Sequence, residues 1–269
     1  MGSALKYRMI ALDVDGTLLN DHYEITENTR RTIAQIHAEG CRIVLCTGRG
    51  PKNTLPLLEQ LGVSGTAITH NGAVTIDGTI DKVLSIITIP TDHLAPLVGY
   101  CRERGMHFDV NSAFHLFVER LGAFEKEMYA KYLNSPIVLP AIEELPEPAV
   151  KLTMFGEPSV MDQAEKDWAG SGKALRMTRS GDFFIDFMEP EATKGAALRK
   201  LAGMWGIPRE SIMAIGNYFN DLEMLEYAGL GIAMQNSPEE VKSRADAVTA
   251  SNNHDGVHQA IVRYMYSQA

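Results

Sequence analysis

The chain has 269 residues, of which 45% are apolar and 22% charged, and its formal net charge is −9. This composition is typical of a globular protein with room for one large α/β unit or two domains, and the acidity argues against a broad basic face for nucleic acid. Its three cysteines are too sparse for a disulfide framework, and no apolar run approaches the roughly 20 residues that a membrane-spanning helix needs.

In the first part of the chain, short apolar runs alternate with helical patterns. The runs lack the polar alternation of a half-exposed strand, so they are typical of strands buried on both faces of a parallel sheet. The helices between them are bounded by residues that favour helix ends, threonine at the start and glycine at the stop. The predicted strands are residues 9–12, 42–46 and 66–69, and the predicted helices run from Thr26 to Gly40 and through Leu55 to Gly62.

The pattern changes between residues 83 and 186, where extended and helical stretches are mixed and no catalytic motif stands out. Strand–helix order then resumes with a helix over residues 193–205, for which Thr193 is the expected N-cap. Further strands are expected at residues 211–215 and 230–234, and a capping box at Ser237-Pro238-Glu239-Glu240 predicts another helix start.

The order of these patterns predicts the fold. Strands and helices alternate before and after the mixed segment, as in a doubly wound parallel sheet. We therefore predict an α/β fold, a Rossmann-like doubly wound parallel sheet core with an inserted α+β domain. The core would comprise residues 1–82 and 187–269, and the inserted domain residues 83–186.

Polar residues follow the predicted strands at the points where the strands end. In an open α/β sheet, ligands bind just beyond the carboxyl ends of the strands, so these residues are expected to meet at one site. Lys194 opens the helix that follows the inserted domain and could reach the same place. The clusters are Asp13-Val14-Asp15-Gly16-Thr17, Thr47-Gly48 and Gly216-Asn217-Tyr218-Phe219-Asn220-Asp221.

Asp13 and Asp15 indicate the chemistry, because two residues apart on extended backbone they point the same way. Two such carboxylates repel unless a cation or a proton separates them, and Mg2+ prefers oxygen ligands, commonly carboxylates with waters and a phosphate. One carboxylate could attack phosphorus, while the other protonates the leaving alcohol and later activates water. The Thr47 hydroxyl and the Lys194 ammonium could hold the phosphate oxygens. Further metal oxygens could come from Asn217, Asn220 and Asp221.

With DVDGT, TGR, Lys194-Gly195 and GNxxND in that order, the chain resembles the haloacid dehalogenase (HAD) superfamily of phosphatases. The inserted domain is similar to the type IIB cap of the Cof-like subfamily, and the resemblance spans essentially the whole chain. It implies that Asp13 is the nucleophile, which forms an aspartyl-phosphate, and that Asp15 is the general acid/base. It also implies that Thr47 binds phosphate and that Lys194 stabilises the nucleophile and the phosphoryl group.

The resemblance further implies a magnesium site formed by Asp13, the backbone carbonyl of Asp15 and the last motif, with Asn217 and Asp221. Asn217 departs from the family pattern, which usually has aspartate at this position. An amide oxygen can ligate Mg2+ but brings no charge, so we expect weaker magnesium affinity than in a close relative with aspartate. Asp221 would then carry more of the charge that balances the metal.

Several of these residues also have simpler structural interpretations. Asp13 and Asp15 could form only a turn, although a carboxylate that ends a buried strand needs a partner. Arg49 either contacts substrate or pairs with a structural carboxylate. Asn71 either forms a turn with Gly72 or contacts substrate. The candidate substrate-binding residues are Thr47, Gly48, Arg49, Asn71, Lys194 and Asn220.

The sequence therefore predicts a cytoplasmic, magnesium-dependent phosphatase of small phosphorylated metabolites such as sugar phosphates. The expected partner is a small-molecule substrate, with no nucleic acid and no membrane, and the chain is expected to be a monomer or a weak homo-oligomer. Two alternatives stay open at this point. The same motifs support a phosphomutase on hexose phosphates, and Asn217 favours a catalytically weak binding or regulatory protein on the same scaffold.

Overall fold

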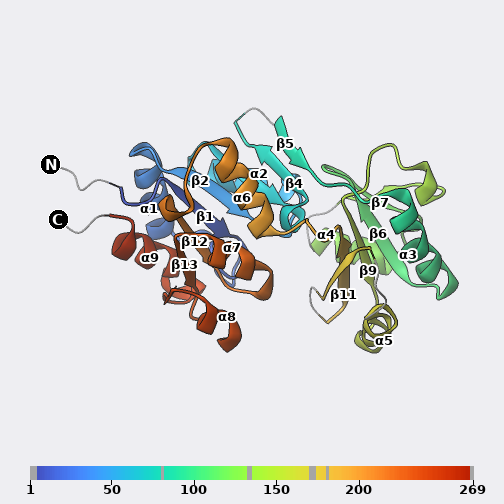
Figure 1. Cartoon of the computed structure of the whole chain (residues 1–269). Coiled ribbons are helices and arrows are strands. Elements are labelled where there is room, and N and C mark those ends of the chain that lie inside the picture. Colours follow the sequence, from blue (N-terminus) through green and yellow to red (C-terminus); the bar gives the residue numbers. More distant parts are fainter. Residues whose placement is uncertain (1–4, 80–81, 132–134, 170–173, 180–181, 267–269) are drawn as a thin grey trace. The chain divides into compact units, whose positions relative to one another are not determined.

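The computed structural model describes residues 5–79, 82–131, 135–169, 174–179 and 182–266 (Figure 1). The chain divides into two compact units, one formed by Met1–Ser85 with Thr193–Ala269 and the other by Ile86–Ala192. Each unit has its own β-sheet and its own apolar core. Across the described ranges, no helix is both long and apolar enough to cross a bilayer.

The first unit is built on an eight-stranded sheet in the order β14-β13-β12-β1-β2-β3-β4-β5. β1 pairs in parallel with β12 on one side and β2 on the other, and parallel pairing continues outward to β14 and β3. β4 turns back antiparallel to β3. The strands are β1 (Met9–Asp13), β2 (Arg42–Cys46), β3 (Gly65–Thr69), β4 (Val74–Asp77), β5 (Lys82–Ile86), β12 (Ile212–Gly216), β13 (Leu230–Ala233) and β14 (Ala247–Val248).

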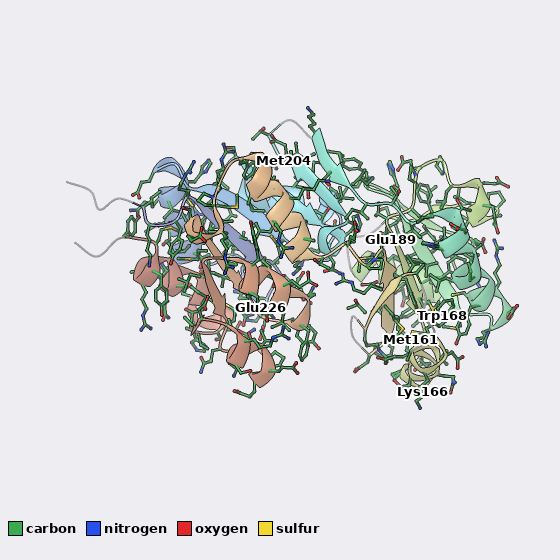
Figure 2. All side chains as sticks on the ribbon, in the orientation of Figure 1. Met161, Lys166, Trp168, Glu189, Met204 and Glu226 are labelled. Carbon is green, nitrogen blue, oxygen red and sulfur yellow. The ribbon has the colours of Figure 1, made fainter. Side chains whose placement is uncertain are left out.

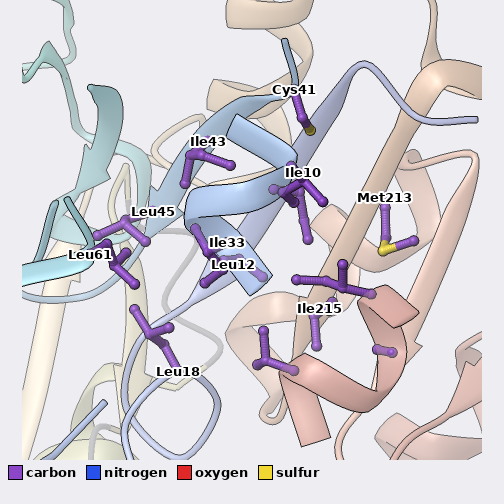
Figure 3. Packing of buried hydrophobic residues seen from close by; sticks show 14 of the residues in the cluster. Ile10, Leu12, Leu18, Ile33, Cys41, Ile43, Leu45, Leu61, Met213 and Ile215 are labelled. Carbon is purple, nitrogen blue, oxygen red and sulfur yellow. The ribbon is translucent and has the colours of Figure 1, made fainter. Parts of the chain in front are cut away.

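Helices cover both faces of this sheet, which explains why its strands are apolar without alternation. On one face, Ile10 and Leu12 pack in a cluster with Ile33 and other residues of α1, α2 and α9 (Figure 3). On the other face, Met9 and Ala11 pack with residues of α6, α7 and α8. The predicted doubly wound α/β core is confirmed. These helices are α1 (Glu27–Ala38), α2 (Pro51–Leu61), α6 (Lys194–Met204), α7 (Leu222–Tyr227), α8 (Glu239–Arg244) and α9 (Gly256–Tyr264).

Local sequence signals set several of the helix boundaries near the strand ends. Thr26 and Thr193 are the N-caps of α1 and α6, and each side chain accepts a backbone N–H of the first helical turn. Gly62 ends α2 with φ of 68°, a conformation that favours glycine. The predicted capping box is wrong, because the extended backbone of Pro238 (ψ 148°) makes it the N-cap and α8 begins one residue later. Ser237 Oγ caps nothing and is buried without a hydrogen-bond partner among the described residues.

The second unit has a six-stranded sheet in the order β10-β11-β9-β6-β7-β8, with β7 and β8 parallel and the other pairs antiparallel. Residues of α3 and α5 join the sheet in one apolar core. Met161 of α5 is buried in this core, whereas Lys166 of the same helix is exposed (Figure 2). The elements are α3 (Thr91–Glu103), β6 (His107–Asn111), β7 (Leu116–Val118), α4 (Ala123–Lys131), β8 (Ile137–Val138), β9 (Lys151–Phe155), α5 (Pro158–Trp168), β10 (Arg176–Arg179) and β11 (Phe184–Met188).

The divisions between the units differ from the predicted domain limits by a few residues. A limit after residue 82 would cut β5, which belongs to the first unit's sheet, and a limit after residue 186 would cut β11, which pairs with β9. Strands within a sheet are joined by backbone hydrogen bonds, so a compact unit keeps its strands nearly whole. The units divide instead after Ser85 and after Ala192.

Candidate active site

The sheet of the first unit brings the predicted polar clusters to one edge. β1 lies between β2 and β12 and is parallel to both, so the carboxyl ends of the three strands are neighbours. Asp13 ends β1, Thr47 follows β2, and the loop 217–221 follows β12. α6 begins with Lys194, whose side chain reaches the same edge.

Asp13, Lys194 and Asp221 form a buried charge cluster. Nζ of Lys194 donates to Asp13 Oδ1 at 2.7 Å and to Asp221 Oδ1 at 2.6 Å. The three residues are between 0% and 5% exposed, so the ammonium has left water for two carboxylates. A lysine at the positive end of a helix is locally unfavourable, and these two contacts supply the compensation.

Burial and the excess of negative charge determine how this cluster ionises. Burial, followed by the charge of Asp221, raises the pKa of Asp13 to about 7, although the Lys194 ammonium acts in the opposite direction. Burial alone would lower the pKa of Lys194, but the two carboxylates outweigh it and raise this pKa above its ordinary value. The lysine is therefore a permanent cation at neutral pH, while Asp13 is poised between its charged and neutral forms.

Asp13 also carries an oxygen without a partner. Its Oδ2 atom is buried and has no hydrogen bond of ordinary geometry from a described residue, although the Thr17 hydroxyl lies near enough to lower the pKa of Asp13. A buried carboxylate oxygen normally has a partner, and a divalent cation or a phosphoryl group would supply one here. The Asp15 carbonyl and the Asn217 side chain, at the ends of β1 and β12, offer the oxygen ligands that Mg2+ prefers. Within the described ranges, no group of three His, Cys, Asp or Glu side chains is arranged to hold a metal, so a cation would depend on these backbone and amide oxygens as well.

Asp221 accepts more hydrogen bonds than the sequence indicated. Besides Lys194, it accepts the backbone N–H groups of Asn217 at 2.8 Å and of Tyr218 at 3.0 Å, both at Oδ2. The residue thus anchors the loop after β12 as well as the lysine. That it carries more than the usual share of the charge that balances a metal stays a prediction.

Arg49 pairs with Asp15, the candidate acid/base, and not with a carboxylate of purely structural role; its contact with substrate stays a prediction. Nε of Arg49 donates to Asp15 Oδ2 at 2.9 Å, and a terminal guanidinium nitrogen donates to Oδ1 at 2.6 Å. Two parallel bonds of this kind fix the orientation of a carboxylate as well as its position. In contrast to Asp13, Asp15 is exposed, so it can meet a substrate from solvent.

Thr47, Asn71 and Asn220 lie close together beside this pair. Oγ1 of Thr47, a buried residue, accepts the backbone N–H of Arg49 at 3.1 Å. The backbone N–H of Asn71 donates to the Thr47 carbonyl at 2.9 Å, and its Oδ1 accepts from Asn220 Nδ2 at 3.0 Å. The Asn71-Gly72 segment is also more than a turn, because a Cβ on Gly72 would lie 2.2 Å from the Thr193 carbonyl oxygen. This close approach packs the segment against the start of α6.

The contacts of Gly16 were not anticipated from the sequence. Gly16 has φ of 74°, and a Cβ at this position would lie 2.3 Å from Nδ2 of Asn217. Its carbonyl oxygen accepts a hydrogen bond from Nδ2 of Asn236 at 2.8 Å. Asn236 follows β13, the strand next to β12, and the strand-end rule that selected the other clusters could have selected it too.

Comparison with known proteins identifies the family that shares this arrangement. The model of the haloacid dehalogenase-like hydrolase family matches residues 10–261. YxeH of Bacillus subtilis (strain 168), whose name assigns it provisionally as a phosphatase, is 36% identical over 267 residues, covering 95% of this chain and 97% of YxeH. YitU of the same strain, named a 5-amino-6-(5-phospho-D-ribitylamino)uracil phosphatase, is 30% identical over 274 residues, covering 95% and 97% of the two chains.

Solved structures agree with this assignment over nearly the whole chain. A haloacid dehalogenase-like hydrolase from Bacteroides thetaiotaomicron is similar with a TM-score of 0.87 and 28% identity, covering 96% of this chain and 99% of its own. TM0651 from Thermotoga maritima gives a TM-score of 0.88 and 28% identity, with 98% of each chain covered. The similarity includes both units, since neither alone would account for this coverage.

Proposed function

The chain belongs to the haloacid dehalogenase-like hydrolase family, and on that premise we propose that this phosphatase uses Mg2+ and an aspartyl-phosphate on Asp13 to hydrolyse phosphate monoesters of small polyhydroxylated metabolites, sugar phosphates among them. One observation carries the proposal. The buried Asp13 carboxylate is held at Oδ1 by Lys194, while its Oδ2 has no partner among the described residues and is available to a phosphoryl group.

In the first step, Asp13 attacks the phosphorus atom through Oδ2. A bond forms between Oδ2 and phosphorus as the bond from phosphorus to the leaving alcohol breaks, and Asp15 gives its proton to the alcohol oxygen. Lys194 balances charge on Asp13 and on the phosphoryl group throughout, because it donates to Asp13 at 2.7 Å and is excluded from water. The Thr47 hydroxyl is available to the phosphoryl oxygens.

In the second step, water replaces Asp13 on phosphorus. The Asp15 carboxylate takes a proton from the water, the new oxygen–phosphorus bond forms, and the bond between phosphorus and Asp13 Oδ2 breaks to release inorganic phosphate. Arg49 keeps the Asp15 carboxylate in one orientation through two hydrogen bonds, which serves both steps.

The residues around Asp13 fit a divalent cation. The Asp13 carboxylate, through the oxygen that does not attack phosphorus, the Asp15 carbonyl and the Asn217 amide oxygen would hold it. When bound, Mg2+ would offset the repulsion between the carboxylate and the phosphate dianion and polarise the phosphoryl group. A pKa of about 7 for Asp13 also supports this part of the proposal, since a cation at that carboxylate favours its charged form.

The substrate class and the cellular setting have separate support. YitU, a relative with 30% identity, is named for a substrate whose phosphate is carried by a ribityl chain, a polyhydroxylated alcohol. The free and buried cysteines Cys41, Cys46 and Cys101 suit a reducing compartment and thus a cytoplasmic protein.

The experiment is phosphate release from a panel of sugar and polyol phosphates and p-nitrophenyl phosphate, each with Mg2+ and with chelator. We expect Mg2+-dependent turnover that is lost in Asp13→Asn, and phosphate bound to the wild-type protein after rapid acid quenching but not to the variant. Turnover that survives in Asp13→Asn would contradict the aspartyl-phosphate. An isomerised sugar phosphate without free phosphate would favour the phosphomutase alternative.

A further inference from the structure

The loop after β1 is held by asparagines from the C-terminal part of the chain. This loop, residues 14–21, contains Asp15 and Gly16 and returns on itself through a bridge between Asp15 and Leu19. Asn236 Nδ2 donates to the Gly16 carbonyl at 2.8 Å, across 220 residues of sequence. Asn252 Nδ2 donates to the Leu19 carbonyl at 3.1 Å.

The two asparagines act together because they are themselves linked. The backbone N–H of Asn252 donates to Oδ1 of Asn236 at 3.2 Å, so each end of the Asn236 amide has a defined partner. Asn252 is 6% exposed, and its Nδ2 also donates to Asp21 Oδ1 at 3.0 Å. We refer to Asn236 and Asn252 as the asparagine clamp.

The clamp holds the backbone next to Asp15, whereas Arg49 holds the carboxylate of the Asp15 side chain. Arg49 fixes the carboxylate group itself and does not hold the backbone carbonyl of Gly16. Gly16 has a left-handed φ of 74° and no side chain, and the N–H of the same peptide unit, that of Thr17, donates to the Val14 carbonyl at a long 3.4 Å. The bond from Asn236 to the Gly16 carbonyl fixes this unit, one residue from Asp15.

We propose that the asparagine clamp positions Asp15 for proton transfer to the leaving alcohol, with Asn236 and Asn252 as positioning residues that touch neither substrate nor the reacting atoms. The inference rests on the proposed function, in which Asp15 is the general acid. A displacement of about 1 Å in such a group can cost a large factor in rate, so one hydrogen bond to its backbone matters.

The test compares kcat/KM for two phosphate esters whose leaving groups differ in their need for a proton. An alkyl or sugar phosphate needs a proton on its departing oxygen, whereas p-nitrophenolate leaves readily without one. The parameter kcat/KM reports the first irreversible step, the transfer to Asp13, for both esters. We expect Asn236→Ala to lower kcat/KM for a sugar phosphate about 10- to 100-fold and to leave kcat/KM for p-nitrophenyl phosphate within about threefold.

Two further variants complete the design. Asn236→Asp keeps the size of the side chain but replaces the donor by an acceptor, and it should reproduce the selective loss. Asn253→Ala is the matched control, because it removes two hydrogen bonds from the same loop, both of them to Asp21 at its far end. Asn236 and Asn253 are both exposed, so the folded state should tolerate each change, and thermal unfolding checks this.

The outcomes separate the inference from the proposed function. A selective loss on the sugar phosphate in both Asn236 variants, without loss in the control, supports positioning. Equal losses on the two esters, or no loss on either, would overturn it, since a structural role does not distinguish leaving groups. If the unaltered protein hydrolyses neither ester, the proposed function fails and the inference falls with it.

Discussion

The two units bury carboxylates in opposite ways. In the first, Asp13 has one oxygen on Lys194 and the other without a hydrogen-bond partner among the described residues. In the second, Asp109 on β6 is as deeply buried, but both of its oxygens are occupied, Oδ1 by Asn111 Nδ2 at 2.7 Å and Oδ2 by the Tyr129 hydroxyl at 3.0 Å. Thr153 similarly donates to Asp186 at 2.8 Å on the neighbouring strands.

Under the proposed function, this difference separates the candidate active site from a structural network. Burial raises the pKa of both carboxyls, Asp13 to about 7 and Asp109 to about 6. A perturbed pKa alone therefore does not identify the active site. What distinguishes Asp13 is that one oxygen of the carboxyl group itself has no partner among the described residues, whereas both oxygens of Asp109 are occupied and have nothing to offer a ligand.

The largest difference should appear when Asp13 and Asp109 are replaced in separate variants. Asp13→Asn removes the nucleophile, and we expect phosphatase activity on p-nitrophenyl phosphate to fall at least about 1000-fold. Asp109→Asn keeps the size of a side chain in the structural network, and we expect activity within about threefold of wild type. Circular dichroism should show both variants folded. Comparable losses in the two variants would mean that unused binding capacity is not what separates these sites.

The same pair predicts a pH dependence of stability in the metal-free protein. Because the folded-state pKa of Asp13 is raised to about 7, the native state holds its proton where the unfolded state has lost it. The stability that this retained proton gives the folded state is on the order of a few kcal/mol. It is fully present below about pH 4 and is lost as pH rises to about 7. Wild type should therefore lose stability as pH rises through this range, and the free energy of unfolding of Asp13→Asn should increase relative to that of wild type.

Urea unfolding in chelator, from pH 4 to pH 8, measures this gain. Asp109→Asn should show a change of the same sign over a narrower window that closes near pH 6, where the raised pKa of Asp109 lies. Stability curves for Asp13→Asn and wild type that run parallel over the whole range would contradict the raised pKa of Asp13.

The sequence was sufficient to predict the fold class and the edge of the sheet where the polar residues meet. Strands buried on both faces leave an apolar run that ends abruptly, and the residue that ends it is visible in the sequence, as at Asp13 and Thr47. Thr193 was equally readable as an N-cap, which located the start of α6 and with it Lys194.

The pairing of side chains within the site could not be predicted. No local pattern names the carboxylate that Arg49 would pair with, and only the packed structure selects Asp15. The contact of Asn236 with Gly16 joins residues 220 positions apart and has no local signal. Ser237 shows the reverse, a strong local signal overridden by the backbone of Pro238.

A smaller effect should follow from adding charge to the reactive site. Asn217→Asp places a carboxylate where an amide now lies against Gly16, and an additional charge beside Asp13 should tighten Mg2+ binding roughly tenfold, or about 1.4 kcal/mol. Calorimetric titration with Mg2+ measures this without turnover. Glu144→Gln, a change of one charge in the second unit, is the control and should leave the affinity unaltered. An Mg2+ affinity that is unchanged in Asn217→Asp would argue against a cation at this position.

The smallest effect concerns the helix that carries Lys194, and the chain offers a matched pair of threonine caps. The Thr193 hydroxyl accepts the N–H of Ala196 and donates to Glu223. The Thr26 hydroxyl accepts the N–H of Thr29 and donates to Asp255. Each threonine therefore makes one cap bond and one bond to a carboxylate, and Thr26 also has a hydrogen bond to the Thr29 hydroxyl at 3.0 Å. Only Thr193 adjoins a residue of the charge cluster.

Thr193→Ala and Thr26→Ala should each lower the free energy of unfolding by about 1 kcal/mol, the usual cost of losing an N-cap. Phosphatase activity should distinguish them. Fraying of the first turn of α6 displaces Lys194 from Asp13, so Thr193→Ala should lower kcat severalfold, whereas Thr26→Ala should leave kcat unchanged. If the two variants lose stability equally and neither loses activity, the position of Lys194 is set by its two carboxylate partners alone, and the cap contributes only to the fold.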